Sequence, residues 1–244
     1  MHNNLWMMTS TGSQFWQLTQ VEKNHGVLHP HFSPDGTMLL WTEIINSQMD
    51  GMGHWAVKLA DFTVGEDGPL LNNIQTLRPQ GLQLYEVHGF SPDGKTILFS
   101  GIEKGGYYYD MEIYLMNLST HSLTQLTVND EWDEHAHFIA DGSHIVWVSS
   151  EGVPQPKGKT LEDIIQNPPK LEYWIMNPDG TDKRRLSFFN DPSNPVYMDI
   201  TGGVGLGDFD PGPQGFTLVA KMREGSEKEV TVLITWYGDC TKSR

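Results

Sequence analysis

Short apolar runs recur along the chain, each directly after a tight-turn sequence. Three of them read TMLLW (37–41), TILFS (96–100) and HIVWV (144–148). They are rich in β-forming residues and nearly continuous, which is typical of strands covered on both faces. The turn that precedes two of them is Ser-Pro-Asp-Gly, in which proline fixes φ and glycine adopts the conformation that reverses the chain. The pattern predicts a protein built from β-hairpins.

These hairpins are copies of one another. The copies are HFSPDGTMLLWTE (31–43), GFSPDGKTILFSG (89–101), HFIADGSHIVWVS (137–149) and the more divergent DFDPGPQGFTLVA (208–220). Between them a second strand–turn–strand element recurs at 4–19, 111–127 and 171–187, with a degenerate version at 55–62 and 74–79. One repeat unit is therefore four short strands, arranged as two hairpins in series.

Four-stranded units that repeat along a chain are the mark of a β-propeller, in which each sheet stacks on its neighbours. We therefore predict an all-β fold, a single propeller domain over residues 1–244 with about four blades of antiparallel strands. A β-sandwich of unrelated hairpins is the alternative, but it does not predict the repetition.

The chain begins with the outer two strands of a unit and ends with inner strands. Three arrangements follow: a compact ring of four blades, a ring completed by a second chain, or a fragment of a longer protein. The start within a blade favours the last two, so a homo-oligomer is one expectation.

The repeats resemble the propeller blades of the TolB family over nearly the whole chain. The residues that carry the resemblance are FSPDG twice, the variants FIADG and FDPGP, and YWIMNPDGTDKRRL (173–186). The resemblance implies a TolB-like propeller. It points to no single function, because such blades serve periplasmic scaffolds, peptidase gating domains and metal-dependent lyases alike.

Charge and composition limit the classes of partner that the chain is expected to bind. The formal net charge of −15 argues against nucleic acid and anionic membranes, which both reward Lys and Arg. No apolar run reaches the roughly 20 residues that a membrane span needs. Cys240 is the single cysteine, which excludes an intrachain disulfide. The N-terminus shows no signal peptide, so we expect a protein that stays inside the cell or one whose N-terminus has been trimmed.

A segment inserted into the third unit, residues 152–170, departs from the repeat. Thr160 and Asp163 have capping-box spacing, and Pro168 and Pro169 end the short helix that this predicts. We expect a flap on one face of the ring. It is either a tolerated surface insertion or a lid that contacts a ligand or partner.

Several catalytic patterns are missing. The glycines of GGVGLGD (202–208) lack the strand–turn–helix context of a dinucleotide site, so no cofactor of that kind is expected. The chain also contains neither G-x-S-x-G nor H-E-x-x-H. It is therefore not expected to be the hydrolase domain of a peptidase.

Histidines recur at fixed places just before the phenylalanine that starts each turn. They are His29 and His31 in the first unit, His88 in the second, and His135 and His137 in the third, with Asp208 in the fourth. If His29 and His31 occupy a strand, their side chains point to the same side, because strand side chains alternate. In a propeller the first strand of each blade lines the channel, so these positions are expected to converge at one channel mouth.

Such a cluster predicts a site for a divalent metal such as zinc or manganese. The predicted ligands are His29, His31, His135, His137 and Asp208. The set resembles the HxH-containing metal site of some propeller lyases, but its offset from the turn differs and the rest of that site has no clear match. The alternative is that these are polar channel residues bonded to water.

Two functions follow from these patterns. The first is a binding or scaffold module, without chemistry of its own, that contacts a protein or a glycan through the ring surface and the flap. The second is a metal-dependent hydrolase or lyase for anionic sugars or phosphate esters. In that second case Glu134 or Asp208 is the candidate ligand or general base.

Overall fold

The computed structural model describes residues 2–46, 54–199, 203–212, 215–224 and 228–236. Its contacts group into two compact units. Unit 1 comprises residues 1–108 and 114–124, and unit 2 comprises 109–113 and 125–244. The organisation as a single domain stays a prediction.

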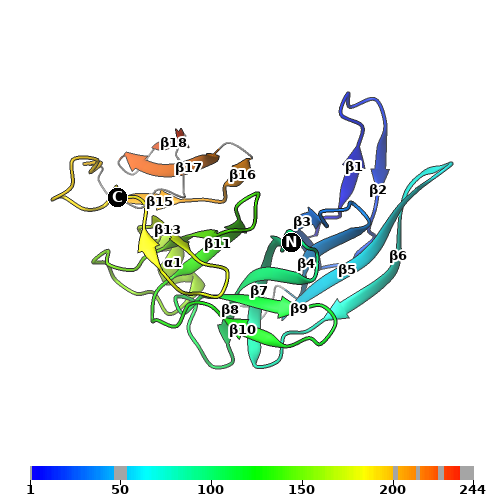
Figure 1. Cartoon of the computed structure of the whole chain (residues 1–244), viewed down its shortest axis with the longest axis horizontal. Coiled ribbons are helices and arrows are strands. Elements are labelled where there is room, and N and C mark those ends of the chain that lie inside the picture. Colours follow the sequence, from blue (N-terminus) through cyan, green and yellow to red (C-terminus); the bar gives the residue numbers. More distant parts are fainter. Residues whose placement is uncertain (1, 47–53, 200–202, 213–214, 225–227, 237–244) are drawn as a thin grey trace. The chain divides into compact units, whose positions relative to one another are not determined.

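Four antiparallel four-stranded sheets follow one another along the chain (Figure 1). The first sheet contains β3 (Gly26–Phe32), β4 (Met38–Asn46), β5 (His54–Gly65) and β6 (Gly68–Leu77). The second contains β7 (Leu82–Phe90), β8 (Thr96–Glu103), β9 (Glu112–Asn117) and β10 (Leu123–Gln125). The third contains β11 (Asp133–Phe138), β12 (Ile145–Ser149), β13 (Glu172–Met176) and β14 (Arg184–Arg185). The fourth contains β15 (Val204–Leu206), β16 (Asp210–Gly212), β17 (Gly215–Glu224) and β18 (Lys228–Trp236).

This architecture confirms the predicted all-β fold of propeller blades. In the first three sheets the strands lie in chain order, so that β3, β7 and β11 are edge strands. In the fourth, β15 and β16 both pair with β17 and together form the first strand. We call this first strand of each sheet the leading strand.

The repeated turns join each leading strand to the next strand. In the first turn, Ser33 donates from its Oγ to Asp35 Oδ1 at 2.7 Å, and Gly36 has a φ of 71°. Ser91 and Asp93 form the same hydrogen bond at 2.6 Å in the second turn. Hydrogen bonds from Ser33 and from Thr37 hold the pKa of the Asp35 carboxyl at about 2. The fourth predicted turn includes residues 213–214, which lie outside the described residues.

Each leading strand carries a one-residue bulge. The register shifts lie between Leu28 and His31, between Val87 and Gly89, and between Glu134 and His137. In the fourth sheet Leu206 faces Ala220 and Asp210 faces Thr217, which is the same offset of one residue. A bulge leaves two residues opposite one and interrupts alternation. The premise that the side chains of His29 and His31 follow simple strand alternation is therefore wrong.

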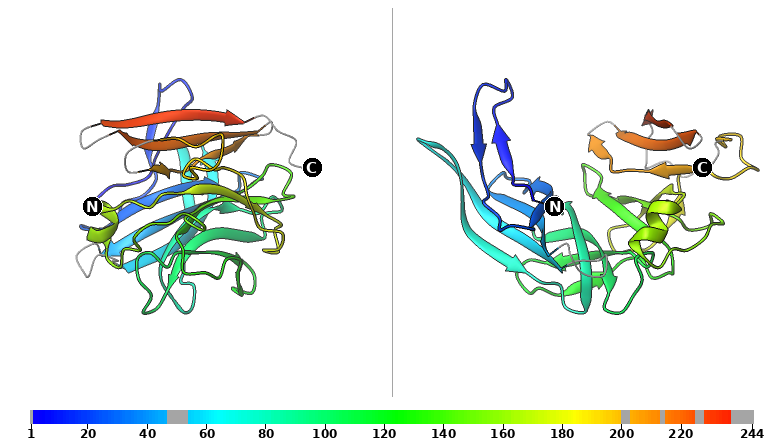
Figure 2. Two further views of the ribbon diagram at one scale, coloured as in Figure 1. Left: turned by 90° about the vertical axis from the view of Figure 1, so that its left-hand side faces the viewer. Right: turned by 180° about the vertical axis from the view of Figure 1, so that it is seen from behind.

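The second hairpin of the first sheet is longer than the sequence predicted. Strands were expected at 55–62 and 74–79, but β5 and β6 continue to a turn between Gly65 and Gly68. A Cβ at Gly68 would lie 2.2 Å from Nε1 of Trp16, so the indole packs directly on this turn. Trp16 comes from β2 (Phe15–Gln17), which pairs with β1 (Trp6–Met8). The β1–β2 hairpin and the β5–β6 tip both extend beyond the rest of unit 1 (Figure 2).

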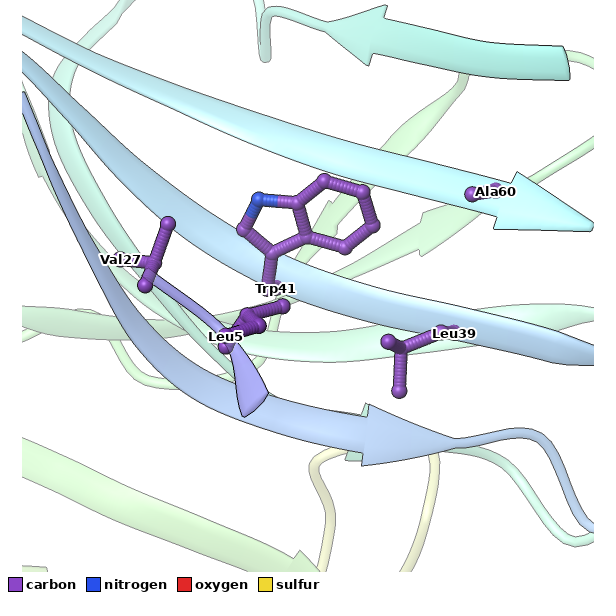
Figure 3. Close-up of a cluster of buried hydrophobic side chains, with 5 residues drawn as sticks. All are labelled: Leu5, Val27, Leu39, Trp41 and Ala60. Carbon is purple, nitrogen blue, oxygen red and sulfur yellow. The ribbon is translucent and has the colours of Figure 1, made fainter. Parts of the chain in front are cut away.

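A small core ties the start of the chain to the first sheet. Leu5 packs with Val27, Leu39, Trp41 and Ala60, all of them buried (Figure 3). Burial of aliphatic and aromatic side chains is the main favourable contribution to folding. This cluster therefore anchors the segment that leads into β1.

Candidate binding pocket and the leading-strand histidines

Within each unit the leading strands of consecutive sheets lie in contact, β3 with β7 and β11 with β16. The positions just before the repeated phenylalanine also meet. A Cβ at Gly89 would lie 3.7 Å from Nδ1 of His31. In unit 2, Nε2 of His137 lies 2.6 Å from Oδ1 of Asp208. The repeat therefore places its equivalent positions side by side within each unit.

In unit 1, His29 and His88 belong to one polar group. Nε2 of His29 lies 3.7 Å from a carboxylate oxygen of Glu86, and its ring centre lies 6.0 Å from that of His88. Nε2 of His88 is 2.7 Å from the Ser100 hydroxyl, and the His88 side chain is buried. His88 is thus a buried side chain that bonds to a neighbouring strand of its own sheet.

In unit 2 a second group forms around β11. Oε2 of Glu134 accepts a hydrogen bond from Nε1 of Trp132 at 2.8 Å and lies 3.4 Å from Nε2 of His135. The His137 ring also packs edge-on against Phe209, with ring centres 4.9 Å apart. Each predicted site residue of this unit therefore has a defined neighbour.

Among the described residues, no three His, Cys, Asp or Glu side chains are grouped so that they could hold an ion. The assignment of His29, His31, His135, His137 and Asp208 as ligands stays a prediction.

The inserted segment carries a short helix, α1 (Leu161–Gln166), where the capping signal predicted it. The Thr160 hydroxyl accepts from the backbone N–H of Asp163 at 3.1 Å, and the Asp163 carboxylate accepts from the Thr160 N–H at 3.0 Å. These two bonds satisfy backbone donors that the first helical turn leaves unpaired. Figure 2 shows α1 beside the strands of unit 2.

Two further contacts fasten this segment, which we call the flap (residues 152–170), to unit 2. The Lys157 ammonium lies 2.8 Å from Oε1 of Glu131. The side-chain amide of Gln155 accepts from the Lys170 N–H at 2.6 Å and donates to the Lys170 carbonyl at 2.8 Å. The flap is therefore closed on itself and attached to the loop before β11.

A pocket of about 480 Å³ lies between the flap and the strands of unit 2. Its lining comes from three places: β11 and the residue before it, the flap with the residue that follows, and the start of β15. These residues are Trp132, Glu134, Gln155, Pro156, Gln166, Asn167, Pro168, Pro169, Lys170, Leu171, Gly203, Gly205 and Leu206. Of the residues predicted for the metal or catalytic site, Glu134 lines this pocket.

A buried carboxylate holds the long connection that leads to β15. Glu172 is fully buried and accepts from Arg185 at 2.7 Å and from the backbone N–H of Asn190 at 2.7 Å. The Asn190 side chain in turn accepts from the Val204 N–H at 2.7 Å and donates to the Leu171 carbonyl at 3.0 Å. This clamp fixes β15 beside the end of the flap, and so it shapes the pocket.

Two other buried carboxylates in unit 2 have raised pKa values. Burial, followed by the charge of Asp133, raises the pKa of Glu112 to about 8. Burial raises the pKa of Asp133 to about 6, against hydrogen bonds from Ser149 and Trp147 that lower it. Sequence reasoning missed Glu112, because nothing in an isolated strand sequence marks a glutamate as buried.

The four blade-like sheets and their repeated turns define the class of this protein as a β-propeller. Among solved structures it is similar to TolB from Acinetobacter baumannii, with a TM-score of 0.58 and 18% identity over 95% of this chain and 48% of that chain. It is also similar to a putative TolB from Agrobacterium tumefaciens, with a TM-score of 0.54 and 19% identity over 87% of this chain and 60% of that chain.

A puromycin hydrolase is similar as well, with a TM-score of 0.52 and 14% identity, over 93% of this chain and 31% of that chain. These similarities support a TolB-like fold. The chain spans less than two thirds of the length of each TolB structure. No family model matches the sequence. In the described part of the chain, no helix is long and apolar enough to cross a bilayer.

Proposed function

We propose that this chain is a TolB-like propeller module that binds a ligand without transforming it, and that its ligand site is the flap pocket. The observation that carries the proposal is the pocket of about 480 Å³, which the inserted segment walls on one side. Ligand pockets are typically about 300–1,000 Å³, and they combine apolar walls with a few placed polar groups. A segment that departs from a structural repeat and walls such a cavity is the natural place for a specific function.

The neighbourhood of Glu134 supports binding rather than catalysis. Its carboxylate is held by the Trp132 indole N–H and lies beside His135. A carboxylate held in this way is a fixed recognition group. In this function the histidines of the leading strands hold neighbouring strands together through polar contacts, as His137 does with Asp208.

The test is a ligand-observed NMR screen of small peptides and saccharides, which represent the protein and glycan partners that the sequence predicts. It compares the natural chain with a variant in which residues 154–169 are replaced by a short Gly-Ser linker. We expect ligands that bind the natural chain and lose binding in the variant, while the thermal unfolding of the remaining strands is preserved. The same ligands binding both proteins, or none binding either, would contradict the proposal.

A metal-dependent hydrolase or lyase is the second candidate. The 2.6 Å approach of His137 to Asp208, at equivalent positions of two sheets, is the observation that favours it. Elemental analysis of protein purified without added metal is the test. A stoichiometric transition metal that disappears in the double variant His31→Ala, His137→Ala would support this candidate. Absence of metal, with no gain in melting temperature on adding zinc or manganese, would exclude it.

A further inference from the structure

Two residues of opposite charge line the flap pocket on different walls. Glu134 comes from β11, and Lys170 comes from the end of the flap. The carboxylate of Glu134 lies beside His135, at 3.4 Å. In the described part of the chain the Lys170 ammonium has no carboxylate within 4.0 Å, the limit for an ion pair. Glu134 and Lys170 therefore form no ion pair with each other, and both charges are available to a ligand.

The position of Lys170 is fixed by two sets of contacts. Its backbone N–H and carbonyl are both bonded to the side chain of Gln155. A Cβ at Gly203 would lie 2.6 Å from Cδ and 2.8 Å from Cε of the lysine, so its aliphatic stem occupies the space that glycine leaves. Gly203 also has a φ of 78°, a conformation that favours glycine. The lysine is thus oriented before any ligand arrives.

The position of Glu134 is fixed in the same manner. The indole N–H of Trp132 donates to its Oε2 at 2.8 Å, which leaves Oε1 to bond to a ligand. The indole is itself held, because Trp132 is buried and its ring contacts Tyr109 at 6.1 Å between ring centres. Preorganised charges bind more strongly because little conformational entropy is lost on association.

The rest of the lining combines apolar residues with three side-chain amides. Its apolar residues include Leu171, Leu206, Pro168 and Pro169. Such a surface takes up an aliphatic side chain. The combination of a carboxylate, an ammonium and apolar walls in about 480 Å³ matches a small zwitterion that carries an aliphatic group.

We propose that the flap pocket binds a dipeptide-sized zwitterion, with the ligand ammonium on Glu134 and the ligand carboxylate on Lys170. This inference rests on the proposed function and names the ligand class of the same site. A neutral saccharide would leave both charges without a partner of opposite sign, and burying unpaired charge is costly.

Isothermal titration with alanyl-leucine tests the proposal. Two blocked forms serve as matched ligands: N-acetyl-alanyl-leucine lacks the ammonium, and alanyl-leucine amide lacks the carboxylate. For the natural chain we expect each block to weaken binding about 10- to 100-fold, the usual effect of losing one charged hydrogen-bonded contact.

The variants make the assignment specific. Glu134→Gln should bind alanyl-leucine about as weakly as the natural chain binds the acetylated form, and acetylation should then have little further effect. Lys170→Met should behave in the same way toward the amide. The control variants Lys95→Met and Glu103→Gln, which remove the same charges in unit 1, should bind like the natural chain. Thermal unfolding of each variant shows that it is folded.

Two outcomes overturn the inference. One is that the natural chain fails to bind alanyl-leucine, and the other is that it binds both blocked forms as tightly as it binds alanyl-leucine. If the NMR screen finds flap-dependent ligands but none is zwitterionic, this inference fails while the binding function stands. If no ligand depends on the flap, both fail.

Discussion

At the residue scale, buried carboxylates distinguish unit 2. The pKa of Glu112 is about 8, because burial disfavours the charged form, while the reference value is 4.5. Between about pH 4.5 and pH 8, Glu112 is therefore protonated in the folded chain and ionised in the unfolded chain. Stability from this group is full below pH 4.5 and is lost as pH rises through 8.

Glu112→Gln should flatten this dependence. For the natural chain we expect the free energy of unfolding to fall as pH rises from 5 to 8, by at most about 1.4 kcal/mol per pH unit for one group. Urea unfolding at several pH values measures it. Glu103→Gln, which removes a surface carboxylate, is the control. A slope that is the same in the natural chain and in Glu112→Gln would show that Glu112 is not responsible.

Glu172 gives a second prediction at this scale. Its carboxylate is fully buried and pairs with Arg185 while also accepting from Ser187 and from two backbone N–H groups. Glu172→Ala should lower the free energy of unfolding by about 3–5 kcal/mol, because it leaves the arginine without its partner. Glu172→Gln keeps an acceptor and should cost less. Equal urea midpoints for the natural chain and Glu172→Ala would show that the hydrogen bonds of Glu172 do not stabilise the fold.

At the element scale, the recurring bulge is the least expected feature. His29 and His135 occupy equivalent places in it, and both have a φ of 50°. This left-handed conformation costs a side-chain-bearing residue about 1–2 kcal/mol, which glycine avoids. The bulge thus stores strain at two of the predicted site residues.

A pair of variants separates the backbone from the imidazole. His135→Gly and His135→Val both remove the ring, but valine is β-branched and poorly suited to this φ. We expect His135→Gly to be more stable than His135→Val by about 1–2 kcal/mol in urea unfolding. Equal stabilities would mean that residue 135 is not left-handed in solution.

The sequence predicted the features that depend on local chemistry. Ser-Pro-Asp-Gly specifies its turn through neighbouring residues, and the capping box of Thr160 and Asp163 likewise specifies the start of α1. The bulge escaped prediction because one extra residue in a strand leaves no mark on a short apolar pattern. The pocket escaped it because it depends on Gly203 leaving room for Lys170, a contact between distant parts of the sequence.

At the scale of the whole molecule, the repeats and the sheets agree on a propeller fold. The residues before Phe90 and Phe209 meet their counterparts from the preceding sheet within each unit. Convergence of all four positions at one channel mouth stays a prediction, because it depends on how the units are arranged. The similarity to the TolB structures, at 18–19% identity, supports the fold alone. The proposed function rests on the pocket instead.

Closure of the ring by a second chain gives a prediction at this scale. One chain has a mass of 27.6 kDa. If two chains complete a ring, light scattering should give twice this value, and dilution should lower it in step with dissociation. A monomer at every concentration would rule out closure by a second copy.

The central claim is that the flap and the strands of unit 2 enclose a ligand site. A crystal structure of the chain grown with a ligand from the NMR screen tests it most directly. The account predicts density for the ligand between Glu134 and Lys170, under the flap. Ligand density elsewhere with this space filled by protein side chains would contradict it.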